Sequence, residues 1–351
     1  MHRHLAFSIL LASTMSVACG ENDEPTINDA GLGTDASADL DAERDANVDA
    51  DAGADAGDPP CHGPPGLYVD GSCTRLAEGV QPYTPSYVLW SDGAQKERFL
   101  FLPAGTTIDT TDPDGWIFPV GTTFWKTFAL GALRVETRVL TKVSAEAGTT
   151  AWTMRVYAWN EAQDAVTEVV DGVTNALDTE HDIPAQAMCE RCHQGSADVG
   201  LGVSAIQLNH DGAGVTLASL EADHVLTVDI PLSDAVVPGN DVERAALGYM
   251  HANCSHCHEG GNLTARFNMR VLVGDATVQG TNAYTTGVSV MSRWAHDGVV
   301  NRIEPANPDA SAVIVRMGTR GDGQMPPIAT EQVDDDGVEA VREFILSLPA
   351  L

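Results

Sequence analysis

The chain has 351 residues, with 50 acidic side chains against 19 lysines and arginines and a formal net charge of −31. This acidity argues against nucleic acid and anionic membrane surfaces as partners, because both are polyanions. The length suggests about two domains once terminal extensions are removed, and the hydrophobic content of 43% is typical of a globular protein.

The N-terminal region predicts export. Residues 1–18 have a basic start, an apolar run and small residues before Cys19, which is the pattern of a signal peptide. The Ser-Val-Ala-Cys sequence that ends at Cys19 resembles the lipobox of bacterial lipoproteins, so we predict a lipid anchor on Cys19, with plain cleavage as the alternative. Residues 19–58 are rich in Asp and Ala and predict a disordered acidic linker. We therefore expect a periplasmic or cell-envelope lipoprotein whose only membrane contact is its lipid.

Residues 59–175 have the composition of β-strands. Stretches such as ERFLFLP, WIFPVGTTFWKTF and LRVETRVLTKV are rich in aromatic and β-branched residues and are separated by turns that contain Gly, Pro and Asp. They predict a β-rich, sandwich-like module.

Beyond this module the sequence predicts mainly helices, so the expected fold class is α+β and multidomain. Residues 176–235 contain the first of two CxxCH motifs, and residues 236–351 contain the second. A helix is expected over 241–253, with Asn240 or Asp241 as its N-cap. A closing amphipathic helix, stopped by Pro349, places five apolar side chains on one face. These are Val338, Val341, Phe344, Ile345 and Leu348.

The seven cysteines can all be assigned, as an exported protein in an oxidising compartment requires. Cys19 belongs to the lipobox, and four cysteines belong to the two CxxCH motifs. Cys61 and Cys73 remain, and we predict that they form a disulfide that closes a Pro/Gly-rich loop. In the loop-entropy model such a link contributes about 3 kcal/mol.

Each CxxCH motif has the residues that covalent haem attachment needs: two thiols for the vinyl groups and an adjacent imidazole for the iron. We therefore predict two haem c groups. Zinc binding and a structural disulfide are the alternatives. Zinc remains an alternative because His251 and His256 are further potential zinc ligands near the second motif. We expect these two histidines to face solvent. The predicted haem-binding residues are Cys189, Cys192 and His193 in the first motif and Cys254, Cys257 and His258 in the second.

A six-coordinate haem needs a second axial ligand. For the second motif we predict Met325, in the segment GDGQMPPIA, with Met317 as the alternative. For the first motif the sequence offers several candidates without favouring one, so an open sixth position is also conceivable. These candidates are His181, Met188, His210 and His224.

Residues 236–351 resemble a class I cytochrome c domain, in the order helix, CxxCH, a loop with Met-Pro-Pro and a closing helix. The resemblance implies thioether bonds at Cys254 and Cys257, with His258 and Met325 as axial ligands. Such domains usually have an aromatic residue four positions before the first cysteine, where this chain has Met250. More broadly, LWSDGAQKERFLFLP, FPVGTTFWKTF and LGVSAIQLN resemble exported bacterial cytochrome c-like proteins over residues 61–351.

We therefore expect a dihaem electron-transfer protein whose partners are redox proteins such as basic cytochromes, attracted by its negative charge. The main alternative is a haem enzyme, an oxidase-like or peroxidase-like oxidoreductase in which the first haem has an open catalytic position. A tethered adhesion or sensor protein with structural haem is a third possibility. Whether the protein is an enzyme is not decided by its sequence.

Overall fold

The computed structural model describes residues 60–259 and 266–350. The predicted signal peptide over 1–18, the lipid anchor at Cys19 and the acidic segment 19–58 lie outside these residues. Residues Ala56–Leu351 form one compact unit by their internal contacts.

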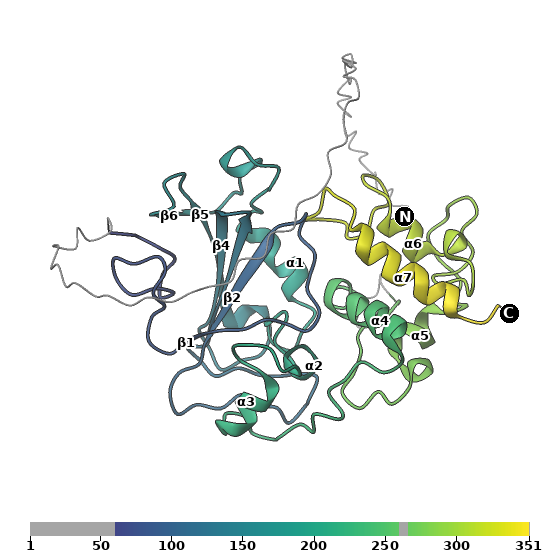
Figure 1. The fold of residues 1–351 in the computed structure, drawn as a ribbon, viewed down its shortest axis with the longest axis horizontal. Coiled ribbons are helices and arrows are strands. Elements are labelled where there is room, and N and C mark those ends of the chain that lie inside the picture. Colours follow the sequence, from purple (N-terminus) through teal and green to yellow (C-terminus); the bar gives the residue numbers. More distant parts are fainter. Residues whose placement is uncertain (1–59, 260–265, 351) are drawn as a thin grey trace, which may run out of the picture. The chain divides into compact units, whose positions relative to one another are not determined.

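An antiparallel sheet of six strands follows the chain order from β1 to β6 (Figure 1). The β-strand composition of residues 59–175 thus predicted the right class of structure. A sandwich would have two stacked sheets, whereas the strands in the described residues form one sheet. The strands are β1 (Val80–Pro82), β2 (Gln95–Phe101), β3 (Thr123–Leu130), β4 (Leu133–Lys142), β5 (Trp152–Trp159) and β6 (Val166–Val169).

Irregular segments cover the two faces of this sheet, and they replace the second sheet of a sandwich. On one face, Phe124 and Trp152 share a core with Val199 and Leu208 from the segment around the first CxxCH motif. On the other face, Trp125 packs with Leu67 and other apolar side chains of the loop that the Cys61–Cys73 disulfide closes. Because both faces are covered, the alternating residues of the strands are buried on both sides. The β module and the segment 176–235 therefore share one core.

Helices α4 (Asp241–Asn253) and α7 (Asp335–Ser347) lie where the sequence predicted helices, and they pack against each other. The side chain of Asn240 accepts a hydrogen bond from the Glu243 N–H, and Glu243 bonds back to the Asn240 N–H, which stabilises the start of α4. At the crossing, the Tyr249 ring lies directly on Gly337, where any Cβ would collide with it. The apolar face of α7 is buried there, with Val341, Phe344 and Ile345 fully inaccessible.

Shorter helices connect these elements. The other α-helices are α1 (Cys189–His193), α2 (Ala205–Leu208), α3 (Leu217–Ala222), α5 (Asn282–Gly287) and α6 (Ala312–Met317). Single 3-10 turns span Thr149–Ala151, Ala176–Asp178, Gln186–Met188, Val278–Gly280 and Pro308–Ala310. Of the helices in the described ranges, none has the length and apolar character needed to cross a bilayer.

Candidate functional site

The second CxxCH motif forms the turn that ends α4. The Cys254 N–H donates to the carbonyl of Met250, and the His258 N–H donates to the carbonyl of Cys254 at 2.9 Å, so the helix continues as a tight turn through the motif. The Nδ1 atom of His258 lies 3.0 Å from the carbonyl oxygen of Phe267. A proton on Nδ1 makes this bond, which leaves Nε2 free as a ligand atom.

A cavity of about 670 Å³ opens beside this turn and is lined by Cys254, Cys257, His258 and Met325. These are the four residues that the sequence assigned to the second haem, and the structure brings all of them to one space. Met317, the alternative ligand, also lines the cavity but is 6% exposed and belongs to the core of the helical part.

The loop that carries Met325 is held by hydrogen bonds to its neighbours. The Met325 N–H donates to the carbonyl of Arg316 at 3.0 Å, at the end of α6. The amide of Gln324 donates to the carbonyl oxygens of Pro326 at 2.9 Å and Thr330 at 3.1 Å. These bonds place the thioether of Met325 at the cavity without help from a ligand.

Five arginines line the same cavity, with Glu259 as the only acidic residue among the lining residues described. Arg302 donates to the carbonyl of Thr286, and Arg316 donates to the carbonyl of Gly323 while its guanidinium lies over the Trp294 ring. The sequence analysis did not predict this concentration of positive charge, because the arginines are scattered along the chain. They are Arg191, Arg266, Arg293, Arg302 and Arg316.

Burial keeps the titratable groups of this turn neutral. It raises the pKa of Cys254 to about 12 and that of Cys257 to about 11. It also lowers the pKa of His258, although the Phe267 carbonyl partly opposes this effect. Reactive redox thiols instead have lowered pKa values, so the turn does not have the electrostatics of a dithiol oxidoreductase.

The first motif forms α1 and lies against the sheet. The Nδ1 atom of His193 is 2.7 Å from the carbonyl oxygen of Val199, so this histidine also has its Nε2 atom free. Burial, followed by the charge of Lys126, lowers the pKa of His193 to about 3. Cys189 packs against the apolar cluster that contains Val135. Neither thiol of this motif lines the large cavity, nor does His193.

The two motifs are in direct contact, which the sequence did not predict. The Sγ atom of Cys257 lies 3.5 Å from the carbonyl oxygen of Arg191. Arg191 is one of the two residues between the cysteines of the first motif. Gly195 packs against the backbone of His256 so closely that a Cβ atom would overlap it.

His251 and His256 do not face solvent, so that expectation was wrong. Both are partly buried, and both line a second, smaller pocket. The Val271 N–H donates to Nδ1 of His251 at 3.2 Å. The reason is tertiary: the chain after α4 folds back over His251, and the segment that contains Gly195 packs on His256.

Cys61 and Cys73 form the disulfide that the cysteine count singles out, with their Cα atoms 5.6 Å apart. The other four cysteines in the described part of the chain are unpaired. Within residues 60–259 and 266–350, no three His, Cys, Asp or Glu side chains gather as a metal-binding group.

No family model matches the chain, and comparisons with curated proteins and with solved structures find no match.

The residues of the second motif fit a covalent haem. The cavity lies within the 300–1,000 Å³ range of cofactor pockets, both thiols line it, and the imidazole is oriented by the Phe267 carbonyl. At the first motif the imidazole is oriented in the same way, but its cysteines lie outside the cavity. The first motif has the residue types that haem c needs, but no described cavity is lined by its two cysteines and His193.

Proposed function

We propose that this protein is an exported c-type cytochrome that carries two covalent haems and transfers electrons. The observation that carries the proposal is the cavity that Cys254, Cys257, His258 and Met325 line together. Two thiols that can attach the porphyrin, together with an imidazole and a thioether that can bind its iron, are the side chains that haem c requires.

A bound haem supplies reversible one-electron chemistry at its iron. The chain supplies the rest: Cys254 and Cys257 hold the group, and the Phe267 carbonyl keeps the His258 imidazole in the ligand tautomer. The arginines that line the cavity would neutralise the two carboxylates of a bound haem. Met325, with its loop pinned to Arg316, is the proposed sixth ligand.

The contact between the motifs supports a relay. Groups attached to Cys192 and Cys257 would lie in neighbouring sites, because the Cys257 thiol touches the backbone of the first motif. Haems held at both motifs would therefore be close enough to form a relay within one chain. We propose redox proteins such as basic cytochromes as partners, since a net charge of −31 favours their approach. A lipid on Cys19 would be the only membrane contact.

A haem enzyme with an open first site is the second candidate, and the hydrogen bonds of two histidines favour it. Nε2 of His181 is bonded to the Glu136 carboxylate at 2.8 Å. His210 is bonded through Nε2 to the Thr84 carbonyl and through Nδ1 to the Gly212 N–H. Two of the four candidate sixth ligands, His181 and His210, are therefore engaged in other hydrogen bonds.

Expression with the c-type maturation machinery tests the proposal. A pyridine haemochrome assay with intact mass should give two haems per chain for the wild type. The paired variants Cys189→Ala/Cys192→Ala and Cys254→Ala/Cys257→Ala should each give one. Bound zinc without haem in the wild type would refute the proposal.

Carbon monoxide then separates the two candidates. The reduced Cys254→Ala/Cys257→Ala variant retains only the first haem. Resistance to carbon monoxide supports the relay, whereas rapid binding supports the enzyme with an open site.

A further inference from the structure

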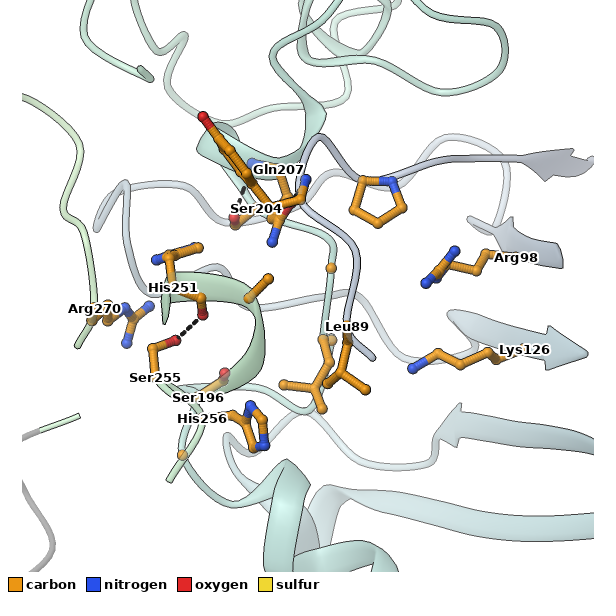
Figure 2. A pocket seen from close by; sticks show the side chains of 17 residues that line it. Leu89, Arg98, Lys126, Ser196, Ser204, Gln207, His251, Ser255, His256 and Arg270 are labelled. Carbon is orange, nitrogen blue, oxygen red and sulfur yellow. Dashed lines mark hydrogen bonds between the residues drawn. The ribbon is translucent and has the colours of Figure 1, made fainter. Parts of the chain in front are cut away.

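The smaller pocket lies between the sheet and the end of α4, and its lining is basic (Figure 2). Arg98 and Lys126 are register partners on β2 and β3 and extend toward the pocket from one side. His251 and Arg270 lie on the opposite side. None of the residues lining the pocket is an aspartate or glutamate, in a chain where acidic residues outnumber lysines and arginines by 50 to 19. We infer that this pocket binds a small anion, either a carboxylate group or an inorganic oxyanion.

Neither of the two cations on the sheet forms an ion pair with a carboxylate in the described part of the chain. Arg98 is 6% exposed, and its only side-chain hydrogen bond is a long one of 3.4 Å to the carbonyl of Lys96. Lys126 makes no hydrogen bond or ion pair with any described residue. The neighbouring Arg138, by contrast, is paired with Glu136 at 2.6 Å. Burying the Arg98 cation without a counter-charge is costly, so an anion in the pocket would offset that penalty.

Electrostatics agree with this geometry. Burial, followed by the charges of Arg98, Arg138 and Lys96, holds the pKa of Lys126 well below its usual range. A negative charge placed among these groups would reverse the effect and favour the charged amine.

The polar side chains around the cations are arranged as donors. Oε1 of Gln207 accepts from the Tyr87 N–H at 2.9 Å, so its amide NH₂ is left to donate. Nδ1 of His251 accepts from the Val271 N–H, so a neutral His251 carries its proton on Nε2. Two cations and two neutral donors suit an oxyanion, which accepts hydrogen bonds and has none to give.

The volume limits the ligand. The pocket measures about 70 Å³, well below the 300–1,000 Å³ range of cofactor pockets. It admits a carboxylate, carbonate, sulfate or phosphate group and excludes a porphyrin ring. The anion therefore comes from one of two sources, a free ion or a propionate of a haem attached at the first motif. The second source is within reach because Gly195 and Ser196, directly after that motif, line the pocket.

Calorimetric titration of the full mature protein with sulfate, phosphate and acetate at constant ionic strength tests the inference. At least one of these anions should bind saturably to the Cys189→Ala/Cys192→Ala variant, which cannot attach the first haem. Adding Lys126→Met to this variant should weaken binding at least about tenfold, because a charged hydrogen-bond partner is lost. Lys126→Arg keeps the charge and should retain binding. Arg155→Gln, an exposed cation on β5, is the matched control and should change nothing.

The two sources give different results in the wild-type protein loaded with haem. If the ligand is a free ion, the loaded wild type binds it as the variant does. If the ligand is a propionate, the pocket is filled and only the variant binds. Absence of saturable binding in both proteins overturns the inference, and so does equal binding by the Lys126→Met protein. Because the pocket is built by the chain alone, these results do not depend on the proposed function: without any haem attachment, wild type and variant bind alike.

Discussion

Gly195 lies against the peptide of His256 so closely that no side chain fits between them. This contact joins the segment after the first CxxCH motif to the turn of the second, at a sequence separation of about sixty residues. It is the point at which the two candidate haem sites meet.

Replacing Gly195 should therefore disturb both motifs. A Cβ at this position meets backbone atoms, which cannot rotate away, so we expect Gly195→Ala to lower the free energy of unfolding by about 1–3 kcal/mol. Denaturant unfolding measures this change. Gly318→Ala is the control, because a Cβ there makes only an ordinary contact of 3.5 Å with the Ile314 carbonyl. Equal stability of the two variants would contradict the close contact.

Met325 should be the methionine that binds the iron of the second site. Met325→Ala is expected to abolish the sulfur-to-iron charge-transfer band at the red end of the visible spectrum while the haem stays attached. Met317→Leu conserves the volume of a core side chain and should keep the band. If the Met317→Leu protein lost the band and the Met325→Ala protein kept it, Met317 would be the ligand instead of Met325.

Asp198 should anchor the first motif to the sheet. Its buried carboxylate accepts hydrogen bonds from Lys142 and Trp152 and from the Phe118 N–H, and the next residue, Val199, orients His193. Asp198→Asn leaves the Lys142 charge uncompensated and should cost about 3–5 kcal/mol in the free energy of unfolding. It should also lower haem occupancy at the first motif, which the haemochrome assay measures.

Two further variants test whether the uncompensated charge of Lys142 causes this loss of stability. Lys142→Met combined with Asp198→Asn removes the unpaired charge and should recover part of the lost stability. Glu168→Gln removes the charge from an exposed carboxylate that binds Arg155 and Gln186, and it should cost less than about 1 kcal/mol. A similar cost for Glu168→Gln and Asp198→Asn would show that burial of the pair is unimportant.

His251 should make the fold sensitive to mild acid. Burial, followed by the charge of Arg270, lowers the pKa of His251 to about 4, whereas an unfolded histidine has a pKa of about 6.5. Between these values the unfolded chain binds the proton more readily, so stability is lost as the pH falls from about 6.5 to 4. The slope from this one group is at most about 1.4 kcal/mol per pH unit.

Unfolding measured across this pH range should show a shallower acid slope for His251→Gln than for the wild type. Glutamine can still accept the Val271 N–H but does not titrate. The exposed His62→Gln should leave the slope unchanged. An unchanged slope in the His251→Gln protein would mean that His251 titrates normally in the folded state.

Local patterns in the sequence were enough to locate helices α4 and α7, the Cys61–Cys73 pair and four of the residues that line the large cavity, namely Cys254, Cys257, His258 and Met325. Capping residues, apolar periodicity and the CxxCH spacing all act over a few residues, so they can be read without knowing the fold. The α+β class follows from the same patterns. The choice between a sandwich and a single covered sheet does not follow from local patterns, because it depends on which distant segment packs on each face of the sheet.

The tertiary structure alone decided the contact of Gly195 with His256, the burial of His251 and the basic pocket. The three cations of this pocket are far apart in the sequence, and no local pattern marks any of them as part of a binding site. They are Arg98, Lys126 and Arg270. They come together because strands β2 and β3 pair in register and the chain after α4 folds back over its end. Long-range packing brings the three cations to one pocket that has no acidic residue in its lining, and it buries Arg98 without a counter-charge.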